Sequence, residues 1–400
     1  MLTIDAMTVG RTLFDQRARS DSTPIALGES QWEFIDRSAR SEVAPVRVLL
    51  NTWFAAYPEP HRGGLLGQLR SRAESQFRAA FWELYLHAAL SASGLTAEVH
   101  PTVPNRTTRP DFLVQGPKGP FYLEARVTAP SQEEVAHRNR AGSIYEALNR
   151  LDSPNFFLYV QVEEPGTVSL NTRTLRPRLL EWLAGLDPDA VLEEMYDEDV
   201  SSPDPRPAGL SRLPRFPWVD NGWRIEFRAW PKGRLRGKAG VRPVGIPGGV
   251  QVGYVDDRSS LKHALEDKVT RYGELDFPYV IAILVSSHTI DQTDLADVMY
   301  GTSVTVMSAD RGLVEFRRRD GVWAKEGAHA VAAVVTVTDL QPWTVGRLSP
   351  IFWHRAEASS AVEPLSSWFI ARLANDSISV EIEEPDLAPS ELFHLPHTWP

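Results

Sequence analysis

The stretch Arg109–Val127, RPDFLVQGPKGPFYLEARV, decides the expected fold of the chain. Two short apolar runs flank GPKG, whose two glycines and one proline favour a tight connection, so the stretch predicts a β-hairpin. Each strand carries an acid: Asp111 begins the first strand and Glu124 lies within the second. Because side chains alternate across a strand, Tyr122, Glu124 and Arg126 are expected to share one face.

Asp111 and Glu124 raise a chemical question, because a hairpin that pairs them brings two carboxylates close enough to share one divalent cation. Two carboxylates, a backbone carbonyl and water molecules are the hard oxygen ligands that Mg²⁺ accepts, and Mn²⁺ accepts the same set. Such an ion beside a phosphodiester polarises the phosphoryl oxygen and activates water, while a nearby cation offsets the developing charge. The alternative is two ordinary surface acids on a hairpin.

The composition sets limits on the class of protein. The chain has 400 residues, which predicts one elaborated domain or two domains. It is 42% hydrophobic, which is typical of a globular core, and its formal net charge is -10. Without an overall basic field, any contact with nucleic acid has to use a local patch. The chain has no cysteine, which excludes disulfides, thiolate zinc sites and a cysteine nucleophile.

Several common motifs are absent from the sequence. The N-terminus has no secretory signal, and the longest apolar runs, YVIAILV and AVAAVV, are of strand length, so we expect a cytoplasmic protein that does not span a membrane. No GxGxxG follows an expected strand, and no GxSxG or HExxH is present. The remaining histidines, His87, His100 and His137 among them, form no metal-binding pattern, and structural or surface roles are predicted for them.

The order of expected elements predicts an α/β fold. Residues 74–91 carry apolar side chains at helical spacing, and strands are expected at 95–101, 110–115 and 120–128. A helix at 259–273 and a strand at 278–287 follow after a long intervening segment. We therefore expect an N-terminal helical segment (1–73), a core (74–290) with an inserted segment at about 128–257, and a C-terminal α+β elaboration (291–400). Within the last part, GLVEFRRRDGVWA (312–324) is expected to form a hairpin with RRRDG near its tip.

Placed in this order, the acids give the chain a resemblance to a known family. Glu83 lies in the expected helix, Pro110-Asp111 opens the second strand, and Glu124-Ala125-Arg126 lies on the third. This arrangement resembles the PD-(D/E)XK nuclease superfamily over residues 74–127, and through 285 if the later helix and strand complete the core. The resemblance implies a restriction-endonuclease-like αβββαβ core with a mixed sheet. It also implies metal ligation by Asp111 and Glu124, with Glu83 assisting directly or through water.

Arg126 departs from the family pattern, because it stands where the family has a lysine. Arginine stays protonated and cannot act as a base, although it contacts phosphate well. Some members of the superfamily supply the lysine from the following helix. In SSLKHALEDKVTRYG, Lys268 lies on the apolar face formed by Leu261, Ala264, Leu265 and Tyr272, whereas Lys262 lies off that face and is expected to be solvated.

Lys268 is therefore the candidate for a relocated catalytic lysine. A lysine that points toward a core requires an acid or a substrate to compensate for its desolvation. The alternative is that Lys268 extends its ammonium to water or pairs with Glu266 or another acid.

A separate basic segment, 206–242, holds ten Lys and Arg with three interleaved Trp. Phosphate contacts and base stacking would use such side chains. The expected nucleic-acid contacts are Arg228, Lys232, Arg234, Arg236 and Lys238. The alternative is a solvated loop beside a strand.

Taken together, these patterns predict a Mg²⁺- or Mn²⁺-dependent nuclease that acts on DNA, in defence or DNA processing. Asp111, Glu124 and Glu83 would serve the metal, and Arg126 or Lys268 would stabilise phosphoryl charge. The alternative is a catalytically inactive protein of the same fold that binds nucleic acid or another protein.

Overall fold

A computed structural model describes residues 12–26, 29–104, 106, 108–128, 148, 151–164, 166, 168, 170–196, 212–238, 257–269, 275–286, 290–308, 312–325, 328–355 and 361–400. The chain divides into two compact units. The larger unit comprises Met1–Ala129 and Asp256–Pro400, and the smaller unit comprises Pro130–Val255. Each has its own hydrophobic core, so each is described by itself.

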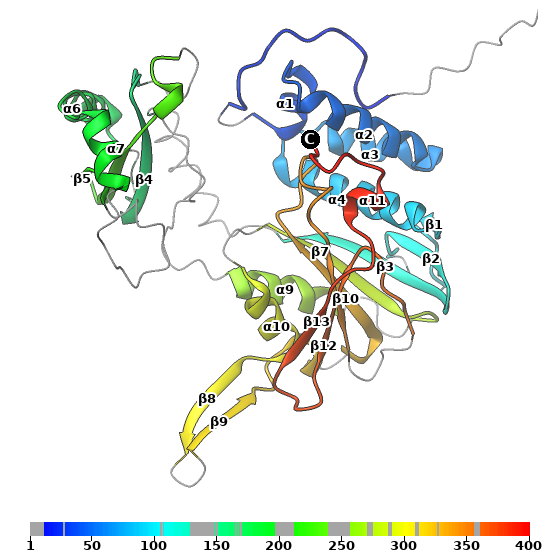
Figure 1. The fold of residues 1–400 in the computed structure, drawn as a ribbon. Coiled ribbons are helices and arrows are strands. Elements are labelled where there is room, and N and C mark those ends of the chain that lie inside the picture. Colours follow the sequence, from blue (N-terminus) through cyan, green and yellow to red (C-terminus); the bar gives the residue numbers. More distant parts are fainter. Residues whose placement is uncertain are drawn as a thin grey trace, which may run out of the picture. The chain divides into compact units, whose positions relative to one another are not determined.

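An eight-stranded mixed sheet forms the centre of the larger unit, in the order β1-β2-β3-β7-β10-β11-β12-β13 (Figure 1). Neighbours pair in parallel at β3–β7, β7–β10 and β11–β12, and antiparallel elsewhere. The expected α/β class is confirmed. The strands are β1 (Thr96–Val99), β2 (Phe112–Gly116), β3 (Gly119–Val127), β7 (Tyr279–Val285), β10 (Val331–Thr338), β11 (Ile351–His354), β12 (Phe369–Leu373) and β13 (Val380–Glu383).

The hairpin expected at 110–128 is confirmed as β2 and β3. Phe112 pairs with Leu123, and Gly116 pairs with Gly119 across the turn. Gly119 has a φ of 122°, a backbone region that residues with a side chain rarely adopt. The GPKG sequence therefore sets the register that places the two acids of the hairpin.

The larger unit also contains helices that precede and follow the smaller unit in the chain. In chain order the helices of the larger unit are α1 (Gln31–Arg37), α2 (Val43–Ala56), α3 (Glu59–Leu69), α4 (Glu74–Ala92), α9 (Asp257–Val269), α10 (Gln292–Tyr300), η2 (Val322–Ala324), η3 (Ala328–Ala330) and α11 (Pro389–Leu392). The helix predicted at 74–91 is confirmed as α4. No helix in the described part of the chain has the length and apolar character needed to cross a membrane.

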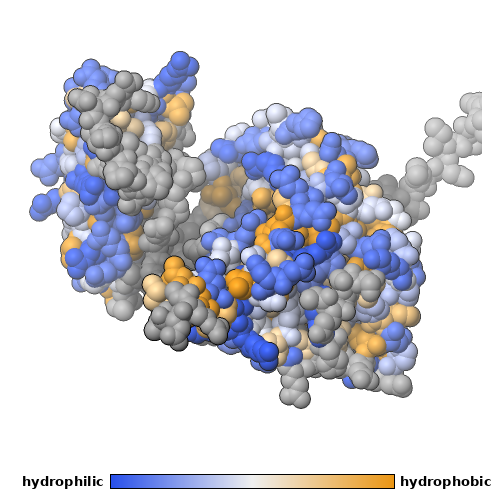
Figure 2. Space-filling model, turned by 60° about the horizontal axis from the view of Figure 1, so that its bottom comes forward, coloured by the Kyte–Doolittle hydropathy of each residue, from blue (hydrophilic) through white to orange (hydrophobic). Residues whose placement is uncertain are grey.

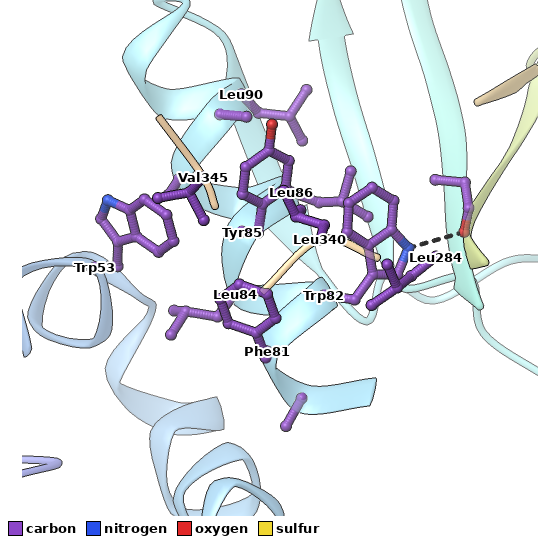
Figure 3. Close-up of a cluster of buried hydrophobic side chains, with 14 of the residues drawn as sticks. Trp53, Phe81, Trp82, Leu84, Tyr85, Leu86, Leu90, Leu284, Leu340 and Val345 are labelled. Atoms are coloured by element: carbon purple, nitrogen blue, oxygen red, sulfur yellow. Dashed lines mark hydrogen bonds between the residues drawn. The ribbon is translucent and has the colours of Figure 1, made fainter. Parts of the chain in front are cut away.

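The helix α4 packs its aromatic side chains against the sheet (Figure 3). Phe81, Trp82 and Tyr85 are almost completely buried, and the rings of Trp82 and Tyr85 stack with their centroids 5.4 Å apart. The Trp82 indole donates a hydrogen bond to the Ala282 carbonyl on β7, at 3.0 Å. This bond joins the helix to the middle of the sheet and satisfies a polar group that would otherwise be buried without a partner.

The helix α9 packs against the opposite face of the same sheet. Leu261 and Leu265 share a hydrophobic cluster with Tyr122 and Ile281, whereas Leu123 belongs to the cluster around α4. The alternation expected along β3 is thereby confirmed. Each face of the sheet buries one set of side chains under its own helix.

The C-terminal residues contribute to the central sheet through β10–β13, and they also form a separate hairpin of β8 (Ser303–Ser308) and β9 (Gly312–Arg317). This hairpin projects from the unit (Figure 1), and hydrophobic residues are visible at its exposed end (Figure 2), where Met307 and Leu313 are largely exposed. The hairpin expected within 312–324 is wrong, because β9 pairs with the preceding strand β8. The residues after β9 turn inward instead, and Val322 is completely buried.

The smaller unit contains a three-stranded antiparallel sheet in the order β4-β6-β5. Leu175, Leu179, Trp223 and Phe227 lie in its core, so Trp223 packs inside and offers no stacking surface. The elements are β4 (Phe156–Glu164), α6 (Thr172–Ala184), α7 (Pro188–Tyr196), β5 (Arg215–Asp220), β6 (Trp223–Pro231) and η1 (Gly233–Leu235).

Candidate active site

Asp111 and Glu124 lie opposite each other on neighbouring strands. The register that pairs Phe112 with Leu123 places Asp111, one residue before β2, across from Glu124 on β3. The backbone N–H of Ala125 donates a hydrogen bond to Asp111 Oδ2, at 2.7 Å. Directly opposite residues of an antiparallel pair point to the same side of the sheet, so the two carboxylates are neighbours there.

Lys268 reaches this pair of acids from α9. Its ammonium forms an ion pair with Glu124 Oε1, and the two side chains are only 7% and 5% exposed. The alternative pairing with Glu266 does not occur, because the Glu266 carboxylate lies 2.6 Å from the ammonium of Lys325. Helix α9 therefore delivers a buried cation to a carboxylate that lies 144 residues earlier in the chain.

The pKa of Asp111 reflects its burial and the two acids that lie close to it. Burial, followed by the negative charges of Glu124 and Glu83, raises the pKa of Asp111 to about 7. The hydrogen bond from the Ala125 backbone and the charge of Lys268 act in the opposite direction but are weaker. The raised pKa keeps the protonated form of Asp111 populated much closer to neutral pH than in an ordinary aspartate. A divalent cation would stabilise the ionised form.

Glu83 approaches the same cluster from α4. The Tyr57 hydroxyl, at the C-terminal end of α2, donates a hydrogen bond to Glu83 Oε1. Burial and the neighbouring Glu83 raise the pKa of Tyr57 well above its ordinary value, so the hydroxyl stays protonated and remains a donor. The N-terminal helices thus hold the third acid in place, a role that the sequence did not suggest for Tyr57.

His100, for which only a structural or surface role was predicted, lies between Glu83 and Asp111. Its Nε2 lies 3.6 Å from Glu83 Oε1, and its Nδ1 lies 3.9 Å from Asp111 Oδ1. The φ angle of His100 is 49°, a left-handed value that costs energy for a residue with a side chain. The pairing of Val99 with Phe112 places His100 opposite Asp111, so aligning β1 with β2 would have found it.

Arg126 and Lys262 differ from Lys268 in their surroundings. The side chain of Arg126 is exposed and forms no hydrogen bond or ion pair with another described residue. Lys262 lies off the buried face, and its ammonium donates a solvent-exposed hydrogen bond to the Asp320 carbonyl at 2.6 Å. Of these three cations, Lys268 alone contacts a carboxylate of the candidate site.

The acids fit a hard divalent cation by type but do not complete its coordination. Asp111, Glu124 and Glu83 offer carboxylate oxygens, the donor class that Mg²⁺ and Mn²⁺ bind. Among the described residues, no group of three or more His, Asp or Glu side chains is arranged to hold a metal ion. Water and substrate oxygens would have to supply the remaining ligands, as is usual for Mg²⁺.

In the smaller unit, the expected nucleic-acid contacts have mixed surroundings. Lys232 is 5% exposed; its ammonium donates to the Ser153 carbonyl at 2.7 Å and lies 5.3 Å from the centroid of the Phe157 ring. Burial lowers the pKa of Lys232. Arg234 and Lys238 are exposed. Lys232 therefore serves the packing of this unit, whereas Arg234 and Lys238 lie at its surface.

The two remaining arginines of that set pair with acids. Arg228 Nε donates to Glu226 at 2.6 Å, and its guanidinium lies 5.9 Å from the centroid of the Tyr159 ring. Arg236 bonds both carboxylate oxygens of Asp189, at 2.9 and 3.1 Å. Both guanidinium groups are thus engaged within the unit.

The chain matches no known family model, no curated protein and no solved structure. What it does is therefore inferred from its own residues.

Proposed function

We propose that the larger unit is a divalent-metal-dependent nuclease with a restriction-endonuclease-like core, which hydrolyses phosphodiester bonds in DNA. The element order α4, β1, β2, β3, α9, β7 supports an αβββαβ core, and β3 pairs in parallel with β7 as a helical crossover requires. The smaller unit, Pro130–Val255, would then be an insertion between β3 and α9.

The observation that carries this proposal is the ion pair of Lys268 with Glu124. Burying an ammonium costs several kcal/mol unless a carboxylate and hydrogen bonds compensate, so such a lysine seldom lies on an apolar helix face without a role. Here it lies beside two further acids, one of which has a raised pKa. Perturbed ionisable groups that gather in this way are typical of catalytic sites.

Each residue has a chemical role in the proposed reaction. Asp111 and Glu124 would hold the metal ion, which would polarise a phosphoryl oxygen and lower the pKa of an attacking water. Lys268 would neutralise negative charge that develops on the phosphoryl group, as the family's lysine does. Glu83, held by Tyr57, would accept a hydrogen bond from a water in the site. Arg126, two residues beyond Glu124 on β3, would contact a neighbouring phosphate.

The proposal is tested by measuring Mn²⁺ binding by calorimetry and the cleavage of plasmid and single-stranded DNA by the full chain. Asp111→Ala and Glu124→Ala should each weaken Mn²⁺ binding and lower cleavage by at least about 100-fold. Glu98→Ala removes an exposed acid of β1 and should change neither.

Two outcomes would contradict the proposal. If Asp111→Ala and Glu124→Ala cut DNA as well as the parent, the active site lies elsewhere. If the parent binds an oligonucleotide but neither binds Mn²⁺ nor cuts, the chain is an inactive binding module of the same fold.

A further inference from the structure

A hollow of about 200 Å³ adjoins the acid cluster on the side of α3. Its polar lining comes from His61, Gln68, Glu83 and His100, and its apolar lining includes Leu65. The rings of His61 and His100 meet edge to face, with their centroids 5.2 Å apart. Since Glu83 and His100 belong to both the hollow and the acid cluster, a molecule bound in the hollow would lie next to the proposed scissile phosphate.

The helix α3 carries glycines on its exposed side that packing does not require. Gly63, Gly64 and Gly67 are exposed, and a Cβ atom built on any of them would meet no atom within 4 Å. Each glycine in a helix interior costs about 1 kcal/mol relative to alanine. Gly64 lines the hollow, whereas Gly63 does not. A side chain at position 64 would occupy space that the glycine leaves open.

The chemistry of the lining indicates which part of a substrate the hollow accepts. The Glu83 carboxylate disfavours a phosphate there and favours a neutral group with N–H donors. Gln68 offers both a donor and an acceptor, which match the edge of a nucleobase. The histidine rings offer flat surfaces on which a base can stack.

We propose that the hollow binds the nucleobase of the nucleotide next to the scissile phosphate. This inference rests on the proposed nuclease function and deepens it by specifying the substrate. A base paired in a duplex cannot enter a hollow without leaving its stack, which costs a few kcal/mol. The preferred substrate is therefore single-stranded DNA, or a nucleotide that has been turned out of a duplex.

The test compares two leucine substitutions in α3 as a matched pair. Gly64→Leu places a side chain in the hollow, whereas Gly63→Leu places the same side chain on α3 outside the lining. Both variants should raise the melting temperature, because leucine favours a helix more than glycine does. Only Gly64→Leu should raise KM for a single-stranded oligonucleotide, by about tenfold, which corresponds to one lost stacking contact.

A second arm uses an oligonucleotide in which one residue beside the cleavage position lacks its base. The parent should cut this substrate about tenfold less efficiently than the intact one, and Gly64→Leu should cut both equally. Equal kinetics for the two leucine variants, or full cleavage of the abasic substrate by the parent, would overturn the inference. If cleavage still depends on Asp111, only the hollow has been misassigned; if the parent neither binds Mn²⁺ nor cuts, both proposals fail.

Discussion

The two units each bury one lysine, and the two lysines are held in different ways. Lys268 in the larger unit and Lys232 in the smaller are 6% and 5% exposed. Lys268 faces the carboxylate of Glu124, with Asp111 beside it. Lys232 donates to the Ser153 carbonyl and lies over an aromatic ring.

The difference shows that burial alone does not identify a functional lysine. The backbone N–H of Lys232 also bonds the Asn155 carbonyl at 2.8 Å, so this residue joins the end of β6 to the start of β4. Its ammonium serves the fold, and desolvation lowers its pKa. Lys268 lies instead where acids gather and where the charge of Asp111 is poorly compensated. The character of its partners is what makes Lys268 a candidate for catalysis.

The largest expected effect separates the two lysines by activity. Lys268→Met should lower kcat for DNA cleavage by about 100- to 1000-fold, because a group that stabilises charge in the transition state is lost. Lys232→Met, which removes an equally buried ammonium, should leave kcat within about threefold of the parent. Both are measured at saturating Mn²⁺, with circular dichroism as the check on folding. An equal loss of kcat in the two variants would show that Lys268 has no catalytic role beyond that of any buried lysine.

The next effect is on stability, measured by hydrogen exchange so that each unit is followed separately. Lys268→Met should destabilise the larger unit by about 3–5 kcal/mol, because it leaves Glu124 buried without its cation. The double variant Lys268→Met/Glu124→Met should recover most of this loss, since no buried charge remains. Lys232→Met should destabilise the smaller unit by only about 1–2 kcal/mol, the cost of one unsatisfied carbonyl. If the double variant is no more stable than Lys268→Met, the loss of the ion pair does not explain the lower stability of Lys268→Met.

The smallest effect concerns Asp111, the acid beside the ion pair of Lys268 with Glu124. Burial and neighbouring acids raise the pKa of Asp111 from 3.8 to about 7 in the folded protein. The folded state therefore binds this proton more tightly than the unfolded state does, and the free energy of unfolding falls as pH rises through that range. Without metal, Asp111→Asn should therefore stabilise the larger unit at pH 8 by on the order of 2 kcal/mol, and should have little effect near pH 4. Urea denaturation at both pH values, with Glu98→Gln as the control, measures this. A variant that is less stable than the parent at pH 8 would contradict the raised pKa.

Local sequence patterns were sufficient for the elements that carry the candidate site. Apolar spacing predicted α4, and GPKG predicted the β2–β3 hairpin. Strand alternation placed Glu124 with Tyr122, and the apolar stripe of α9 placed Lys268 on the buried face. These features depend on the periods of helices and strands, which neighbouring residues determine by themselves.

Only the tertiary structure decided which residues the buried faces of these helices and strands contact. Periodicity shows which side of α9 is buried, but the packing of α9 on the sheet selects Glu124 as the partner of Lys268 and leaves Glu266 to Lys325. The alignment of β1 with β2 brings His100 to the acids, and the end of α2 brings Tyr57. Likewise Lys232 belongs to a basic stretch whose sequence is typical of an exposed surface. Its side chain is nevertheless buried, because β6 pairs with β4 and brings it to the Ser153 carbonyl. Each of these contacts joins residues that are distant in the chain, so its existence depends on how whole elements pack rather than on any local pattern.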